Sequence, residues 1–581
     1  MCHLPLVKAA LMALALLIAA CSEPATGRLA IRVVDGPGGQ PVPARLELLD
    51  ARGTAWVPPQ ALPLRFECFM APLPDWAAEF VTLSDRIDNR PEGTEQFYLD
   101  GTGAMDLPAG HYRLRAFRGI EVSVASREVE VVAGQETGLE IELERWADLA
   151  AEGWWSVDDH VHITRRTPED DESIAAWMRA EDLRIANLLQ MGTVDQVSVT
   201  PQHDFGDAGT VRRGDTLLLA GQEHPRTHFL GHTITLGADA LVDRRDTYIV
   251  YETTFREGLR LGGLPGYAHF GIGPARTGLT LDAPRGLVFF LEVLQFDFAW
   301  YRDWYALLDL GLRIAPTAGT DFPCGLFAGV PGRERFYVKL DAPPTRASLV
   351  AGVRAGRTFV TNGPLLELRV GDAGIGGEIA LSGPATRPVR ARVRFDPARD
   401  DVKQVALIVN GEARPLQPEI VAAGDLRVET EVELRETGWL ALRVQGDKVG
   451  ETPLGPSPPE AANEFLSKLF DFREMNERIE AAYSERGRVR PTAAHTAAIF
   501  VKVAGAPLPH AIERAEQALA RLEDLEARLG EDRLADQTLW DWFPYSDAVS
   551  EEHLRRNRPA LLQAIREARA HYAAVVEESE P

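Results

Sequence analysis

The chain has 581 residues, which is too long for one domain and fits about three or four. It carries 62 Lys and Arg residues against 86 Asp and Glu residues, and the formal charge of −24 argues against nucleic-acid partners and against membrane binding through a basic patch. Four cysteines in a chain of this length exclude a disulfide framework.

The N-terminal residues 1–20 have the pattern of a signal peptide. A weakly basic start precedes the apolar run AALMALALLIAA, which is shorter than the roughly 20 residues of a membrane span. The sequence IAAC at 18–21 resembles a bacterial lipobox, which implies cleavage before Cys21 and lipidation of its thiol. The alternative is plain secretion with cleavage near Ala20. We expect an exported protein at the bacterial cell envelope, on the periplasmic face or the outer membrane, whose only membrane contact is its lipid.

Residues 28–146 predict a β-sandwich. The stretches 29–35 and 44–50 alternate apolar and polar residues and are separated by the turn GPGGQPVP. The run PAGHY at 108–112, followed by alternating apolar residues, resembles carboxypeptidase-regulatory-like modules, which are structural or binding appendages. The Pro-rich region 51–96 shows no regular pattern.

Residues 147–362 alternate short apolar strands with amphipathic helices. The stretches 172–183 and 303–311 predict helices, and the second ends at a glycine. Continuous apolar strands between such helices are typical of a buried parallel sheet or barrel. The predicted strands are 216–221, 231–237, 263–270, 286–294 and 312–319.

The remaining chain divides into a second β region, 363–505, and a helical region, 506–581. The stretch 404–416 contains an Asn-Gly pair, a strong hairpin signal, and 426–446 alternates along its length. We expect 497–505 to be the last strand of this second β-sandwich. The apolar residues at the start of the helical region keep helical spacing and should pack against the body of the protein. They are Ile512, Ala515, Leu519, Leu522, Leu525 and Leu529.

Histidines and carboxylates gather at the ends of the strands predicted in 147–362. His160 and His162 alternate across Val161, so a strand would point both imidazoles to the same face. In an α/β barrel the chemistry lies where the strands end. Each residue alone also fits a surface histidine, a packing histidine or a helix N-cap, but their coincidence at strand ends indicates a site for Zn, Mn or Fe. The residues are Asp158, Asp159, His160, His162, Glu223, His224, His232, His269 and Asp321.

Five segments in order carry a resemblance to a known family. DDHVH, GQEHPRTHFLGH, GYAHFG, PTAGTD and GRTFVTNGPLL together resemble the CehA/McbA branch of the PHP (polymerase and histidinol phosphatase) superfamily of metal-dependent hydrolases, over about 147–370. The resemblance implies a distorted (β/α)7 barrel with a polynuclear metal site, here flanked by two β-sandwiches and followed by the helical segment. Glu223 would be the bridging carboxylate. The implied ligands are His160, His162, Glu223, His232, His269 and Asp321.

The last of these motifs departs from the family pattern. Many PHP proteins have a histidine two residues after the final aspartate, but here Asp321 is followed by Phe322 and Pro323. We therefore expect one or two divalent ions rather than three.

Several further residues are candidates for roles around such a site. Asp158 would orient a ligand imidazole, or is an ordinary acid at a strand end. His224, with His203 and His228 as alternatives, would protonate the leaving group. Arg165 would clamp an anionic substrate, or is a solvated loop charge.

Glu292 lies within the apolar strand FFLEVLQ, and a buried acid requires a partner. We expect it to support the metal ligands or to pair with an arginine.

The sequence thus favours a surface-tethered metallohydrolase. It would use metal-activated water on an ester, carbamate, amide or phosphoester bond of a small molecule or an envelope polymer. The alternative is a non-catalytic envelope lipoprotein whose β-sandwiches bind a glycan or a protein.

Overall fold

The structure is a computed structural model that describes most of the chain. The predicted signal peptide, Cys21, His228, His269 and the segment 453–462 lie outside the described residues. The described residues are 25–64, 87–88, 95–192, 194, 199–227, 229–268, 275–295, 298–323, 329–446, 492–530 and 551–577.

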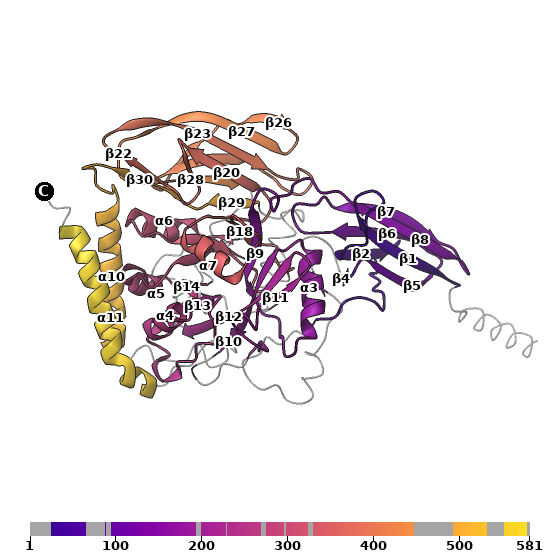
Figure 1. The fold of residues 1–581 in the computed structure, drawn as a ribbon, viewed down its shortest axis with the longest axis horizontal. Coiled ribbons are helices and arrows are strands. Elements are labelled where there is room, and N and C mark those ends of the chain that lie inside the picture. Colours follow the sequence, from indigo (N-terminus) through magenta and orange to yellow (C-terminus); the bar gives the residue numbers. More distant parts are fainter. Residues whose placement is uncertain are drawn as a thin grey trace, which may run out of the picture.

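The N-terminal region contains two sheets that share one apolar core (Figure 1). The first has the order β5-β1-β8 and the second the order β3-β4-β2-β6-β7. Residues that alternate along the strands point inward from both sheets, including Leu29, Leu46 and Leu114. The strands are β1 (Thr26–Asp35), β2 (Ala44–Asp50), β3 (Ile87–Asp88), β4 (Glu95–Leu99), β5 (Thr102–Pro108), β6 (Gly110–Phe117), β7 (Ala125–Val131) and β8 (Glu136–Leu143).

The middle region is organised around strands that close into a barrel, in the order β9-β10-β12-β13-β14-β15-β17. A parallel bridge between Val161 and Phe322 connects the end of β17 back to β9. Neighbouring strands are parallel except at β13, which runs antiparallel to both of its neighbours. The strands are β9 (Trp154–Val161), β10 (Ile185–Met191), β12 (Thr216–Thr227), β13 (Gly231–Leu236), β14 (Leu264–Tyr267), β15 (Phe290–Gln295) and β17 (Ala315–Ala318).

Helices and short strands connect or flank the barrel strands. Both helices predicted here occur, as α3 and α6, but α4, α5 and α7 have no counterpart in the sequence prediction. The helices are α3 (Asp170–Ala180), η1 (Arg245–Thr247), α4 (Tyr251–Arg260), α5 (Ala275–Asp282), η2 (Ala283–Arg285), α6 (Tyr301–Asp309) and α7 (Arg346–Arg354). The remaining strands are β11 (Val211–Arg213), β16 (Phe298–Ala299), β18 (Arg335–Lys339) and β19 (Thr358–Thr361).

The second β region forms a five-stranded sheet, β21-β20-β23-β27-β26, that packs on a further group of strands. This group contains β22, β24, β25, β28, β29 and β30, and it joins the barrel sheet because β29 pairs with β19. The strands are β20 (Leu365–Val370), β21 (Ala373–Gly374), β22 (Glu378–Leu381), β23 (Ala385–Arg394), β24 (Gln404–Val409), β25 (Glu412–Pro415), β26 (Glu419–Ala422), β27 (Asp425–Leu434), β28 (Gly438–Gln445), β29 (Ala493–Thr496) and β30 (Ile499–Val503).

Two sequence signals in this region have different outcomes. The Asn-Gly hairpin is confirmed: β24 pairs with β25, and Asn410 and Gly411 both have positive φ, as a two-residue turn of this kind requires. The alternating stretch 426–446 is not one strand, because β27 and β28 belong to different sheets.

Two long helices, α10 (Ala511–Gly530) and α11 (Glu551–Glu577), end the described chain. They pack against each other and against α5, as Figure 1 shows at the side of the barrel. The predicted apolar stripe is buried at Ala515, Leu522, Leu525 and Leu529, whereas Ile512 is exposed. None of the helices in the described parts of the chain is long and apolar enough to cross a membrane.

Candidate metal centre

Strand β9 brings His160 and His162 to one place in the barrel. His162 directly follows the last residue of β9, Val161, and the extended backbone keeps its side chain on the same face as that of His160; both imidazoles are fully buried. Their Nε2 atoms lie 3.0 Å apart. The bridge from Val161 to Phe322 sets the residues after β17 beside this pair, which positions Asp321.

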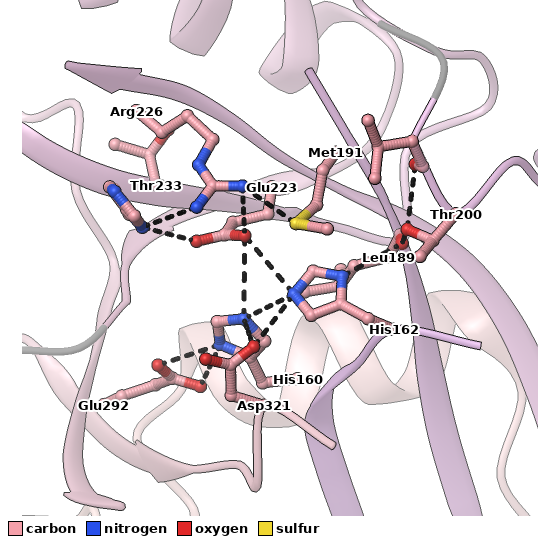
Figure 2. Close-up of polar contacts among 12 residues, drawn as sticks. His160, His162, Leu189, Met191, Thr200, Glu223, Arg226, Thr233, Glu292 and Asp321 are labelled. Carbon is pink, nitrogen blue, oxygen red and sulfur yellow. Dashed lines mark hydrogen bonds and ion pairs between the residues drawn. The ribbon is translucent and has the colours of Figure 1, made fainter. Parts of the chain in front are cut away.

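Four side-chain atoms from three parts of the barrel converge here (Figure 2). Glu223 Oε2 lies 3.3 Å from His162 Nε2 and 3.8 Å from His160 Nε2. Asp321 Oδ1 lies 3.1 Å from His162 Nε2 and 3.4 Å from His160 Nε2. Neighbouring ligands at bond lengths of about 2.0–2.2 Å around a cation are roughly 3–3.5 Å apart, so most of these spacings suit a shared metal ion.

Hydrogen bonds to the other ring nitrogens orient both imidazoles. His160 Nδ1 lies 3.0 Å from Glu292 Oε1, and His162 Nδ1 lies 3.3 Å from the carbonyl oxygen of Leu189. Since a carbonyl and a carboxylate accept, each Nδ1 carries the proton, and in the neutral tautomer both Nε2 lone pairs face the same point. A cation between them would relieve their repulsion.

The surrounding charges also favour a cation at this point. Burial alone would lower the pKa of His160, but the charges of Glu292 and Asp321 raise it well above its usual value. Burial, together with the charge of Glu292, raises the pKa of Asp159 well above the ordinary range. The negative field that would hold a proton on His160 would equally hold a metal ion.

Glu223 has a second contact on its other oxygen. Glu223 Oε1 lies 2.8 Å from Nδ1 of His232, the second residue of β13. Since β13 runs opposite to its neighbours, its first residues lie at the same edge as the ends of the parallel strands. Burial would raise the pKa of Glu223, but the charges of Arg226 and His232 hold it well below the usual range. Glu223 is therefore an ionised carboxylate.

The structure thus contains a buried group, His160, His162 and Glu223, that could hold a metal ion. Two imidazole nitrogens and a carboxylate oxygen form a donor set that suits Zn, Mn or Fe. Asp321 contacts both imidazoles, and His232 contacts Glu223. Five of the six predicted ligands are described, and all five lie in this cluster.

Asp158 does not orient an imidazole. Its carboxylate accepts hydrogen bonds from Thr320 Oγ1 (2.6 Å) and the Gly332 amide (2.7 Å), and from the backbone amides of Thr320 and His160. Burial raises its pKa to about 6. Asp158 therefore fixes the backbone that carries His160 and Asp321, while Glu292 has the imidazole-orienting role.

His224 faces away from the cluster, which corrects its predicted role as the proton donor. It follows Glu223 on β12, and consecutive strand residues point to opposite faces. Its Nε2 contacts the Val242 carbonyl oxygen, and its ring stacks on Tyr248. Burial lowers the pKa of His224 to about 4, so it is a neutral packing residue.

Arg165 is also engaged elsewhere, and the predicted anion clamp is corrected. It is fully buried and donates to Gln202 Oε1 (3.0 Å), Asp171 Oδ1 (3.3 Å) and the Gly209 carbonyl (2.8 Å). His203 lies 3.2 Å from Asp171 in the same network. These residues hold the segment that follows β10 rather than a substrate.

Arg226 is the residue at this site that the sequence analysis did not identify. It lies three residues after Glu223, so regular alternation would put the two on opposite faces. A register shift in the β12–β13 pairing, between Glu223 and Arg226, inserts one extra residue and brings both to the same face. Pro225, which lies between them, is the sequence signal that favours a bulge at this place.

The comparisons with known proteins do not identify a family. No protein-family profile matches the chain, and no curated protein matches it. Among solved structures, it is similar to the minor pilin GBS52 of the gram-positive pathogen Streptococcus agalactiae, over 22% of this chain and 47% of that chain, with 16% identity and a TM-score of 0.14. The match therefore spans about half the length of the pilin, and a TM-score this low carries no argument about function.

Proposed function

We propose that the protein is a metal-dependent hydrolase with its active site at the ends of the barrel strands. The observation that carries this proposal is that the Nε2 atoms of His160 and His162 lie 3.0 Å apart, with Glu223 Oε2 and Asp321 Oδ1 each 3.1 to 3.8 Å from both of them. These four residues would hold the ion. A bound divalent cation would supply activation of water and polarisation of the oxygen of the scissile group.

Two residues that would not bind the ion, Glu292 and Asp158, hold the proposed ligands in position. Glu292 keeps the proton of His160 on Nδ1, which leaves Nε2 available as a donor atom. Asp158 ties Thr320 and Gly332 to β9, and so sets the backbone on which Asp321 stands.

The side chains of Asp321 and His232 mark the open side of the cluster. They are 12% and 24% exposed, whereas those of His160 and His162 are fully buried. We infer that substrate approaches from this side.

The resemblance to CehA/McbA hydrolases adds to the proposal. The barrel, parallel except for one reversed strand, is compatible with the distorted PHP-type barrel that the resemblance implies. The proposed substrates carry an ester, carbamate, amide or phosphoester bond, in a small molecule or an envelope polymer. The lipobox-like IAAC at 18–21 would place the enzyme at the cell envelope.

Metal analysis of the chain from residue 22 onward tests the proposal. We expect near-integral Zn, Mn or Fe in the wild type and its loss in His160→Ala and Asp321→Ala. His111→Ala changes an exposed histidine of β6 and should keep the metal. Hydrolysis of a panel of esters, carbamates and phosphoesters should follow the metal content.

Two results would contradict the proposal. A wild-type chain that binds none of these ions, even when they are added, has no metal centre, and the binding-scaffold alternative then stands. A chain that keeps its metal in both ligand variants holds it elsewhere.

A further inference from the structure

The two oxygens of Glu223 face different neighbours. Oε2 faces the His160 and His162 pair, whereas Oε1 lies 2.8 Å from His232 Nδ1. A carboxylate with imidazoles on both sides has the arrangement of a bridge between two cations. Next to His232, however, a positive charge is already present, and it also contacts Oε2 from the side away from the His160 and His162 pair (Figure 2).

That charge is the guanidinium of Arg226. Its Nη1 lies 3.4 Å from Glu223 Oε2, and its Nη2 lies 3.4 Å from His232 Nδ1. Its side chain is only 4% exposed, and Nη1 also contacts the sulfur of Met191 at 2.8 Å. The bulge in the β12–β13 pairing directs the Arg226 side chain to the same face as Glu223, so the backbone determines where the guanidinium lies.

We propose that Arg226 takes the place of a second metal ion and limits the centre to one metal. The proposal rests on the proposed metal centre. It adds that Glu223 binds a metal through Oε2 only, while its Oε1 accepts a hydrogen bond from His232.

Three physical arguments support a single metal. An arginine side chain stays protonated at any pH that the fold tolerates, so its charge cannot be withdrawn to admit a cation. A cation bound to His232 Nδ1 would lie within a few ångströms of Arg226 Nη2, where two like charges shielded from water repel strongly. In addition, the 2.8 Å contact between Glu223 Oε1 and His232 Nδ1 leaves these atoms directly paired.

The test is a titration of the metal-free full chain with Mn²⁺. Calorimetry measures how many equivalents bind, and electron paramagnetic resonance shows whether the bound ions are isolated or coupled. We expect one equivalent in the wild type, with the signal of an isolated Mn²⁺ ion. Arg226→Gln removes the charge and should raise the stoichiometry to two equivalents, with the signal of two coupled ions. Arg226→Lys keeps the charge and serves as the matched control, with one equivalent expected.

Each other outcome is informative. Two equivalents in the wild type, or one equivalent in Arg226→Gln with an unchanged circular dichroism spectrum, would overturn the role of Arg226 and leave the metal centre intact. Binding that survives His160→Ala, or no binding at all, would overturn the metal centre itself. Since no readout depends on turnover, the result is independent of the substrate.

Discussion

At the scale of single residues, the contact between Glu292 and His160 is the clearest support for the proposed metal centre. Replacing Glu292 with Gln removes the negative charge that holds the proton on His160 Nδ1, while the size of the side chain is kept. We expect metal affinity to fall about 10- to 100-fold. A competition titration against a chromophoric chelator measures this change.

Glu121→Gln is the matched control for this variant. Glu121 is also buried and accepts a hydrogen bond from Tyr337, but it lies outside the cluster. Its replacement should leave metal affinity unchanged. If both variants weaken binding equally, the effect comes from general destabilisation and not from the orientation of His160.

At the scale of elements, helix α10 depends on one buried face. Leu522 is fully buried in the shared core with α11, whereas Ile512 on the same helix is 38% exposed. We expect Leu522→Ala to cost about 2–5 kcal/mol of unfolding free energy, because it leaves a cavity, and Ile512→Ala to change it by only about 0.5 kcal/mol. Urea denaturation compares the two, and equal costs would show that α10 does not dock as described.

The junction between α6, β28 and β29 predicts acid sensitivity. His495 lies against the rings of Tyr301, Trp304 and Tyr305 on α6, and Tyr305 in turn contacts Trp439 on β28. Burial lowers the pKa of His495 to about 3. The folded state therefore keeps His495 neutral, while the unfolded chain binds a proton below a pH of about 6.5. The contribution of His495 to the free energy of unfolding is therefore fully present above that pH and is lost as the pH falls toward 3.

A non-titrating variant measures this loss. The stability difference between wild type and His495→Gln should shrink by about 2–3 kcal/mol between pH 7 and pH 4.5, at 1.36 kcal/mol for each pH unit below 6.5. Urea denaturation of metal-free wild type and metal-free His495→Gln at each pH gives the two free energies of unfolding that are compared. Parallel curves would mean that His495 is accessible to protons in the folded state.

At the scale of the whole molecule, a buried ion pair joins the N-terminal sheets to the barrel region. Arg45 Nε on β2 lies 2.6 Å from Glu181 Oε1 at the end of α3, and Tyr98 donates to the same oxygen. Both charged side chains are almost fully buried. Glu181→Ala should cost about 3–5 kcal/mol, because it leaves Arg45 charged and buried.

The double variant Arg45→Met, Glu181→Met separates this explanation from simple loss of packing. Removing both charges should be milder than removing one. Thermal unfolding of the full chain checks the order of the three proteins. A double variant that is less stable than Glu181→Ala would show that the pair itself stabilises the docking.

Much of the element order was predictable because short apolar runs between turn residues are a local property of the sequence. Strands β12, β13, β14, β15 and β17 each overlap a predicted strand. Helix α4 was missed because YETTFREGLR contains β-branched residues and Val250 before it provides no side-chain cap. The division of 426–446 into two sheets depends on the strands with which each half pairs, β23 for β27 and β24 for β28. The local alternation of apolar residues does not indicate these partners.

The candidate site was predictable in its ligand types and only in part in its geometry. His160, His162, Glu223 and Asp321 could be proposed because these residue types at strand ends are uncommon together. Orientation was harder: simple alternation explains why His224 faces away, whereas the position of Arg226 depends on a bulge. The role of Arg165 was also not predictable. Its hydrogen-bond partners, Asp171, Gln202 and Gly209, come together only when the chain folds.

The pairing of β29 with β19 has a consequence for the folding of a chain that emerges N-terminus first, from the ribosome or from an export channel. Proteins emerge from their N-terminus, and regions fold as they become available. The N-terminal sheets use residues 26–143 only, so they can form early. The edge of β19, however, stays open until residues 494–496 have emerged. The emerging chain must therefore keep an uncovered barrel edge until the whole second β region has appeared, and this is the interval in which we expect chaperones to bind it.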